Sequence, residues 1–277
     1  MTESQAEIEK EVGKKSSSSK ENPKTQREIL VDQICEGVET YKEKSSNVFL
    51  SAITAGLEIG FSFLLLGMLY GILKDRVSKD VIFNLMAFAY PIGFIIVVLG
   101  KSMLFTEQTS LLALPVFHKK RSITELIKLW GIVISGNLIG GFIFTILGVG
   151  ICVSLGIVSN ESIGKIAEHV TKADSIIIFG SAILAGWLMA VLSWLLSSSK
   201  DTISRILVVY IITFTVGFAG FHHSIVGNIE VFAGLIYTSK ISFLDYLTFQ
   251  GIALLGNAFG GVFFVGLLRY RTIASNF

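Results

Sequence analysis

After about residue 46 the chain consists mainly of long apolar stretches separated by short polar segments. Each stretch approaches or exceeds the roughly 20 residues that an α-helix needs to cross a bilayer. The six stretches cover residues 48–73, 81–117, 127–156, 175–196, 206–237 and 246–268. The pattern therefore predicts an all-α integral membrane protein with six transmembrane helices.

The second and fifth stretches are too long for one simple span, and each contains a polar island. The first island is Gly100–Thr109 and the second is Gly220–Glu230. Polar groups in hydrocarbon need partners, and irregular backbone at membrane depth is tolerated only where it lines a protected cavity. We therefore expect the second and fifth helices to break at the islands and to resume as half-helices.

The segment before the first span has a different pattern. Residues 1–26 contain few apolar positions, which predicts a disordered, solvated tail. From about residue 27 to 44, apolar residues recur at spacings of three and four, which predicts an amphipathic helix on the membrane surface or against the bundle. The predicted division is a cytoplasmic tail over residues 1–45 and a transmembrane transporter domain over residues 46–277.

A nine-residue motif occurs twice, 120 positions apart. Gly136–Phe144 reads GNLIGGFIF, and Gly256–Phe264 reads GNAFGGVFF. The same offset places Met103–Phe117 opposite His223–Tyr237, so the two polar islands coincide. Two halves of three spans each must enter the membrane from opposite sides. This predicts an inverted 3+3 repeat with a substrate site near the midplane, where the two breaks meet.

Composition and charge agree with this picture. Hydrophobic residues make up 52% of the chain, and its mean hydropathy is +0.68. With a cytoplasmic N-terminus, the inner segments hold 16 Lys and Arg residues and the outer loops hold 6, which predicts a multi-pass protein of the cytoplasmic membrane with both termini cytoplasmic. The net charge of +2 does not suggest nucleic-acid binding. The two cysteines support neither a disulfide framework nor a cysteine metal site.

The repeated motifs contain glycines one helical turn apart and a polar residue beside them. The glycine spacing favours close helix packing. Asn137 and Asn257 are open to two interpretations, because a buried amide can bridge helices or face a pore.

The first island supplies several candidate pathway residues. Leu104 and Phe105 can close a narrow passage by excluding water, and Thr106 offers a hydroxyl beside them. The alternative for the two apolar residues is ordinary packing. Lys101 and Glu107 are six residues apart and can pair if the loop folds back.

The second island combines imidazole, hydroxyl, amide and carboxylate groups. A neutral imidazole at mid-membrane can orient an anion or exchange a proton with it, and we favour His223 over His222 for this role. Ser224 and Asn228 add hydrogen-bonding groups. Glu230 is either a lining residue or a structural partner. In the first span the isolated carboxylate of Glu58 is expected to face the bundle interior.

With these motifs the chain resembles the formate/nitrite transporter family over residues 46–270. The resemblance is carried by Gly100, Leu104-Phe105-Thr106, Gly136-Asn137, Gly220-Phe221-x-His223-Ser224 with Asn228, and Gly256-Asn257. It implies an aquaporin-like protomer of six helices, assembled as a homopentamer with one pore in each protomer.

By this resemblance His223 corresponds to the central histidine, and Leu104 with Phe105 to a hydrophobic constriction. Thr106 corresponds to the loop threonine and Asn257 to the sixth-span pore asparagine. The chain departs from the family pattern in four respects. His222 replaces a glutamate, Gly186 replaces a fourth-span asparagine, Lys172 matches the vestibule lysine only approximately, and Glu58, Lys101 and Glu107 are additional charges.

The resulting hypothesis is channel-like transport of small weak-acid anions such as formate or nitrite, with protons supplied at or near His223 and no cofactor. A second hypothesis is that the added acidic residues redirect the channel toward a neutral or cationic solute. A third, from a different class, is an intramembrane metal enzyme that uses His222, His223 and Glu230. It is disfavoured because the one-turn spacing of the His-Glu-x-x-His motif is missing. The expected partners are therefore a small anion, protons, the lipid bilayer and further copies of the chain.

Overall fold

The computed structural model describes residues 23–274, and every regular element within them is helical. Five helical segments are long and apolar enough to cross a membrane: Ser45–Leu73, Lys79–Gly100, Ile123–Ser154, Ser175–Ser198 and Phe243–Ala274. Two shorter apolar helices, Thr202–Phe218 and Ser224–Tyr237, supply the remaining span. The predicted all-α membrane fold is confirmed. Most of the predicted disordered tail lies outside the described residues.

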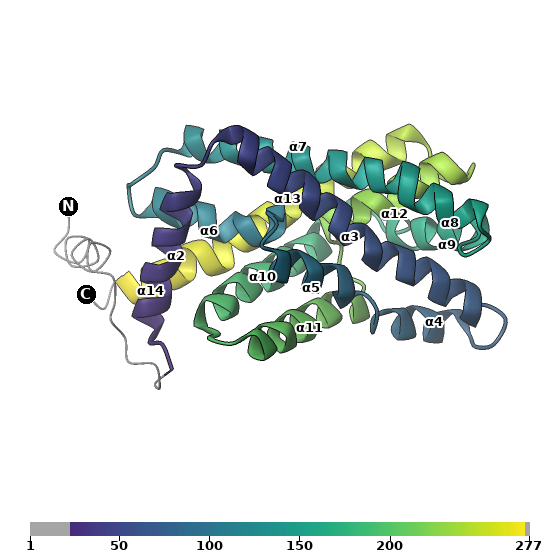
Figure 1. Cartoon of the computed structure of the whole chain (residues 1–277), viewed down its shortest axis with the longest axis horizontal. Coiled ribbons are helices and arrows are strands. Elements are labelled where there is room, and N and C mark those ends of the chain that lie inside the picture. The colour runs from purple at the N-terminus through teal and green to yellow at the C-terminus, as the bar shows by residue number, and fades with distance from the viewer. Residues whose placement is uncertain (1–22, 275–277) are drawn as a thin grey trace.

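The second and fifth spans are broken, as the polar islands predict. The second consists of α4 (Lys79–Met86), α5 (Pro91–Gly100) and α6 (Phe105–Phe117). The fifth consists of α11 (Thr202–Phe218) and α12 (Ser224–Tyr237). From the centre of the bundle, α6 and α12 run toward opposite ends (Figure 1).

A left-handed residue lies in each break and ends the preceding half-helix. Lys101 has φ 59° and Gly220 has φ 65°. Glycine adopts this conformation readily, whereas lysine does so at a cost of about 1 kcal/mol or more. Each lies four residues before the start of the next half-helix, at Phe105 or Ser224, so both breaks begin with the same change of backbone direction.

The two halves pack in the same way. In the first half α3 (Ser45–Leu73) runs along α7 (Ile123–Phe144), and in the second α10 (Ser175–Ser198) runs along α13 (Phe243–Gly260). Each of α7 and α13 continues into a π-helical segment, η1 (Thr145–Val149) and η2 (Gly261–Leu267). The first begins directly after the repeated glycine-asparagine motif, and the second begins within it. Short α8 (Gly150–Ser154) and α14 (Leu268–Ala274) complete these spans.

A second repeated motif explains the tight contact between these helix pairs. SAITAG in α3 begins at Ser51 and SAILAG in α10 begins at Ser181, which is an offset of 130 rather than 120. A Cβ at Gly56 would overlap the carbonyl oxygen of Asn137, and a Cβ at Gly186 would overlap that of Asn257. Only glycine permits this backbone approach, which brings each asparagine side chain to its break.

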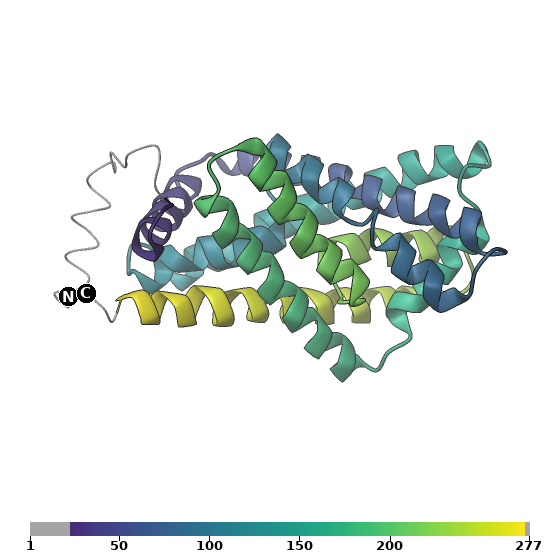
Figure 2. The same ribbon diagram turned by 90° about the horizontal axis from the view of Figure 1, so that it is seen from below.

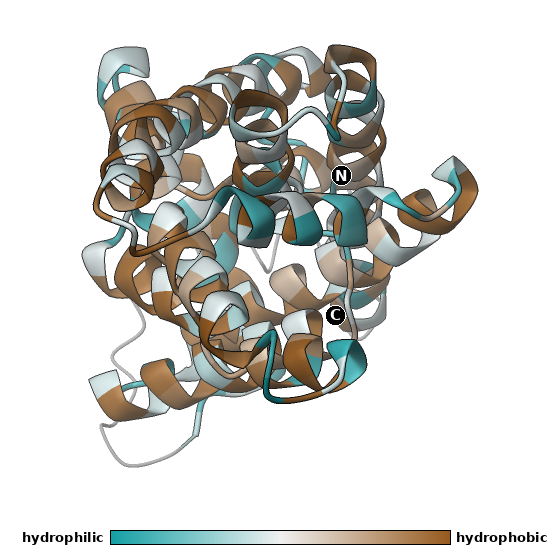
Figure 3. Cartoon of the chain, turned by 90° about the vertical axis from the view of Figure 1, so that its right-hand side faces the viewer, coloured by the Kyte–Doolittle hydropathy of each residue, from teal (hydrophilic) through white to brown (hydrophobic). Residues whose placement is uncertain are grey.

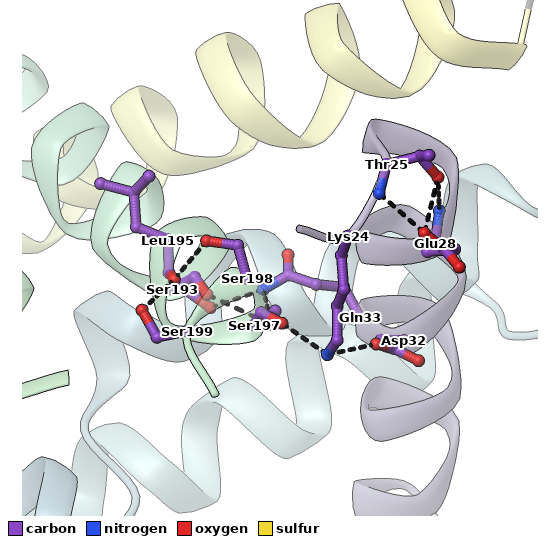
Figure 4. A network of polar contacts seen from close by, with 10 residues as sticks. All are labelled: Lys24, Thr25, Glu28, Asp32, Gln33, Ser193, Leu195, Ser197, Ser198 and Ser199. Carbon is purple, nitrogen blue, oxygen red and sulfur yellow. Dashed lines mark hydrogen bonds and ion pairs between the residues drawn. The ribbon is translucent and has the colours of Figure 1, made fainter. Parts of the chain in front are cut away.

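Helix α2 (Gln26–Thr40) lies against the bundle, where it packs on α6 and α10. It begins with a capping box in which the Thr25 and Glu28 side chains bond each other's backbone N–H groups. Figure 4 shows the polar contacts that fasten it to α10. Gln33 Nε2 donates to Ser193 Oγ and Ser197 Oγ, both at 3.0 Å, and Lys24 Nζ donates to the Ser197 carbonyl at 2.7 Å. Of the two predicted locations, the structure shows the one against the bundle.

The opposite end is covered by α9 (Asn160–Thr171), an amphipathic helix that the hydrophobic pattern did not predict. Two ion pairs fasten it: Lys74 after α3 lies 2.5 Å from Glu161, and Lys240 lies 2.9 Å from Glu168. Figures 1 and 2 show α2 and the end of α14 at one end of the molecule and α9 at the other. The described chain therefore begins and ends on the same side of the bundle.

The outer surface of the bundle is strongly apolar. In the end-on view of Figure 3, hydrophobic residues (brown) cover most of the helices. Large exposed hydrophobic side chains occur on every long span and include Leu50, Phe61, Ile72, Ile127, Ile146, Ile176, Trp187, Leu255 and Phe259. A surface of this kind needs lipid or further protein around it.

Candidate functional site

The two breaks meet at a hydrogen bond between Thr106 and His223. The Nε2 atom of His223 lies 2.7 Å from Oγ1 of Thr106, and both residues are buried. His223 also caps α12, because its Nδ1 atom accepts from the N–H of Val226 at 3.2 Å. A backbone N–H can only donate, so the ring proton of the neutral imidazole is on Nε2 and Thr106 accepts it.

An apolar layer surrounds this hydrogen bond. The Phe94 ring lies edge-on to the His223 imidazole, with a centroid distance of 5.0 Å and an interplanar angle of 83°. Leu104 is fully buried at the N-cap of α6. The Phe105 ring instead packs on Trp130 of α7, at 5.7 Å and 89°. Of the two predicted constriction residues, Phe105 is thus engaged in packing on α7.

Asn257 braces the second break rather than lining an open passage. It is fully buried, and its Oδ1 atom accepts from the N–H of Ser224 at 2.7 Å. Its Nδ2 atom donates to the carbonyls of Ala182 at 2.7 Å and His222 at 3.0 Å. The side chain thus makes three hydrogen bonds, all to backbone groups. Of the two interpretations that the sequence left open, these contacts support bridging and not pore lining.

Two neighbouring polar residues of the second island also lie in the packed interior. Asn228 is fully buried: its Oδ1 atom accepts from the Tyr246 hydroxyl at 2.7 Å, and its Nδ2 atom donates to the Leu138 carbonyl at 3.4 Å. Ser224 is fully buried, and its Oγ atom has no hydrogen-bond partner. Asn228 therefore holds α12 against α7 and α13.

A cavity of about 230 Å³ reaches the central histidine from the α9 end; we call it the α9-side cavity. Its walls combine aromatic and aliphatic side chains with six ionisable ones, Tyr90, His169, Lys172, His222, His223 and Glu230. Lys172 is exposed, whereas Glu230 is only 7% exposed. His169 stacks on the Phe83 ring at a centroid distance of 3.7 Å.

His222 holds the second break to the α9 end. Its Nε2 atom is 3.0 Å from the Val170 carbonyl, which can only accept, so Nε2 carries the proton. Its Nδ1 atom is 2.8 Å from Ser181 Oγ, which in turn accepts from the His222 backbone N–H at 3.1 Å. Both ring nitrogens are therefore occupied by structural contacts, although the side chain borders the α9-side cavity.

A second cavity, of about 490 Å³, opens at the α2 end; we call it the α2-side cavity. Its ionisable lining residues are the acids Glu36, Glu39, Glu43 and Glu107 and the bases Lys101 and Arg205. Lys101 and Glu107 both line it, but no ion pair within residues 23–274 joins them. The pairing that their spacing allowed is absent there.

Glu58 lies beside the first break, as an interior carboxylate should. Its Oε1 atom would be 3.2 Å from a Cβ placed on Gly100, and its Oε2 atom is buried without a hydrogen-bond partner. Glu58 is not among the residues that line the α9-side or the α2-side cavity.

Sequence reasoning missed four residues that shape the centre. Ser51 Oγ accepts from the Met103 N–H at 3.1 Å, just as Ser181 Oγ accepts from His222. The repeated SAIxAG motif contains both serines and was the available signal. Phe94 and Tyr90 gave no such signal, because they are aromatic residues within a continuous apolar run.

Comparison with known proteins gives consistent matches. A model described as "Formate/nitrite transporter" matches residues 27–271. The inner membrane protein YfdC of Escherichia coli strain K12 is 30% identical over 279 residues, covering 97% of this chain and 86% of that protein.

Two solved structures share the fold. One, described as an FNT family ion channel, has a TM-score of 0.77 at 20% identity and covers 88% of this chain and 98% of its own. The other, described as a pentameric formate channel with formate bound, has a TM-score of 0.70 at 21% identity and covers 83% and 97%.

Proposed function

The chain belongs to the formate/nitrite transporter family, and on that premise we propose that it conducts small weak-acid anions of the formate or nitrite type across the membrane. The family comprises transporters and channels, not enzymes. The solved relative with formate bound supports a substrate of this size and charge. The proposed passage runs from the α9-side cavity, past Thr106 and His223, to the α2-side cavity.

The observation that carries this proposal is the 2.7 Å contact between His223 Nε2 and Thr106 Oγ1 at the start of two half-helices. The N-termini of α6 and α12 both lie here, and a helix N-terminus carries partial positive charge that favours an anion. The Nε2–H group of His223 and the hydroxyl of Thr106 are hydrogen-bond donors that an anion can use once it separates them.

The apolar layer determines whether the solute passes as an ion or as a neutral acid. The Phe94 ring lies against the His223 imidazole, and Leu104, two residues before Thr106, is fully buried, so we assign both side chains to the layer that excludes water. A bare charge crosses such a layer at high cost, whereas a neutral weak acid crosses it at far lower cost. This supports coupling of anion movement to a proton. Lys172 at the mouth of the α9-side cavity contributes the positive potential that attracts the anion.

A second candidate function rests on the charge of the α2-side cavity. Four carboxylates and two basic groups line it, which is an unfavourable vestibule for an anion. This composition favours passage of a neutral or cationic solute. Reversal potentials in planar bilayers separate the two functions, since anion and cation selectivity give opposite signs. If Glu107→Gln leaves the ion preference unchanged, the acidic residue at that position does not set it.

We further propose that the protein is a homopentamer in the cytoplasmic membrane, with residues 1–45 as a cytoplasmic tail. The pentameric assembly of the solved relative and the apolar outer surface support this. Native mass spectrometry in detergent should give five copies. A cysteine-labelling reagent that cannot cross the membrane should reach a cysteine introduced at Asn160 from outside the cell and one introduced at Ser198 only after permeabilisation.

The transport function is tested in proteoliposomes loaded with formate, nitrite, acetate, lactate, hydrosulfide or ammonium at two pH values. We expect flux of the small monovalent acids and a fall of at least about tenfold in His223→Ala, which removes the Nε2–H donor. His223→Gln retains one donor and should lose less. Glu161→Gln, at an exposed ion pair on α9, is the control. Unchanged flux in both His223 variants would contradict the assigned role.

A further inference from the structure

Glu230 is a buried carboxylate that the fold leaves without a protein partner. It is only 7% exposed and lines the α9-side cavity. Within residues 23–274 no hydrogen bond or ion pair reaches it; its one electrostatic neighbour is the Tyr90 side chain. It lies seven residues after His223, the N-cap of α12, which is about 10 Å along the helix axis, and both residues line the α9-side cavity.

If the Glu230 carboxylate were ionised, no ion pair or hydrogen bond within residues 23–274 would compensate its negative charge. Burial of an unpaired charge costs several kcal/mol, so the group binds a proton or faces a passing cation. Lys172 also lines the α9-side cavity but is exposed, and within residues 23–274 no ion pair joins it to Glu230. The walls near it are aromatic and aliphatic, among them Leu66, Met86 and Phe249.

The other ionisable groups that face the cavity are unsuited to proton transfer. His223 and His222 each have both ring nitrogens occupied. A cationic His223 would lose the hydrogen bond that its Nδ1 atom accepts from the Val226 N–H, and a cationic His222 would have to reverse its hydrogen bond with Ser181. A cationic His223 would also stand at the positive end of α12. His169 is stacked on Phe83, and the Tyr90 phenol is a far weaker acid than a carboxyl.

We propose that Glu230 is the proton-transfer group of the pathway, and that His223 hydrogen-bonds the solute at the apolar layer without titrating. The protonated carboxyl of Glu230 meets the anion that enters the α9-side cavity. The O–H bond of the carboxyl breaks and an O–H bond forms on the anion, which leaves as the neutral acid through the apolar layer. The Glu230 carboxylate then takes a proton from a hydronium ion that enters from the α9 side and leaves water, so one proton moves with each anion.

This inference rests on the proposed transport function, and its test uses proteoliposomes with the full chain under an imposed pH gradient. Wild type should take up formate faster as the α9 side becomes more acidic. In Glu230→Gln, whose amide cannot release a proton, the uptake driven by the gradient should fall at least tenfold and lose its pH dependence. Glu230→Asp retains an acid and should preserve the pH dependence. Glu161→Gln is the matched carboxylate control on an exposed surface.

Infrared difference spectroscopy gives a readout that needs no transport. Wild type at neutral pH should show the C=O stretch of a protonated carboxyl, and Glu230→Gln should lack it. Absence of that difference, or pH-driven uptake in Glu230→Gln equal to wild type, would overturn the inference. Uptake of methylammonium by wild type but not by Glu230→Gln would also overturn it. If wild type moves no anion at all, the transport function fails, while the infrared result still reports whether Glu230 holds a proton.

Discussion

Asn137 and Asn257 make the same three hydrogen bonds at the two breaks of the bundle. In each, Oδ1 accepts from the first N–H of a half-helix, that of Phe105 for Asn137 and of Ser224 for Asn257. Each Nδ2 donates to two carbonyls, one on the neighbouring long helix and one in the break. In each break, one amide side chain therefore satisfies backbone groups that have no partner within a helix.

The first prediction is that Asn257→Ala destabilises the fold. The change leaves the buried Ser224 N–H and two carbonyls without partners, and each unsatisfied group costs about 1–3 kcal/mol. We expect a loss of about 3 kcal/mol or more and a lower thermal unfolding midpoint in detergent. Asn137→Ala should behave alike. Asn47→Ala, at an exposed position in α3, is the control. An unchanged midpoint for both core variants would show that the braces are dispensable.

The second prediction concerns the contact between α13 and α10, which positions the Asn257 side chain at the break. A Cβ at Gly260 would overlap the carbonyl oxygen of Ile183 in α10, whereas a Cβ at Gly251 of the same helix would meet no atom within 4 Å. Gly260→Ala must push α13 away from α10, and such overpacking costs about 1–3 kcal/mol. Gly251→Ala should leave the unfolding midpoint equal or slightly higher, because alanine favours the helix. Equal midpoints for the two variants would be inconsistent with the contact.

The sequence predicts the breaks because polar islands within apolar runs have few physical explanations in a membrane. The island and the repeat also predict that His223 lies where the two breaks meet, and its contact with Thr106 shows this position. The sequence does not decide the role of Asn257, because bridging and pore lining need the same residue type at the same place. The SAIxAG repeat was missed because its offset of 130 differs from the 120 of the longer motif.

His222 shows a second limit of the sequence. Two adjacent histidines suggest shared chemistry, yet the partners that fix this ring are the Val170 carbonyl and the Ser181 hydroxyl, on segments 52 and 41 residues away. Hydrogen bonds over such separations depend on how α9 and α10 pack. They leave no periodic pattern in the chain. The sequence did not predict α9 either, so the partner that this helix supplies was also missed.

The third prediction is that Thr106→Val lowers transport more than Thr106→Ser. Valine has nearly the same shape but removes Oγ1, so the buried Nε2–H of His223 loses its acceptor. The cost of about 1–3 kcal/mol releases the imidazole from its orientation, and flux should fall about tenfold. Serine keeps the hydroxyl and should retain most of the flux. Initial rates of formate uptake in proteoliposomes measure both, and equal rates would mean that the hydrogen bond does not position His223.

The last prediction concerns pH and the α9 end. Burial, with a smaller contribution from Lys172, lowers the pKa of His169 to about 4, below its ordinary value of 6.5. Above the ordinary value both folded and unfolded chains hold a neutral ring, so its stabilising contact with Phe83 is fully present. As the pH falls from about 6.5 toward 4, the unfolded chain binds a proton that the folded chain does not, and stability is lost.

His169→Phe tests this, because phenylalanine keeps a ring against Phe83 and does not titrate. Thermal unfolding midpoints of wild type and variant are compared at about pH 7.5 and about pH 5, on either side of the ordinary histidine pKa. Other groups shift both proteins alike, so the difference between them reports His169. Wild type should lose more stability on acidification than the variant. An equal loss would mean that the folded protein accepts the proton on His169 as readily as the unfolded chain does.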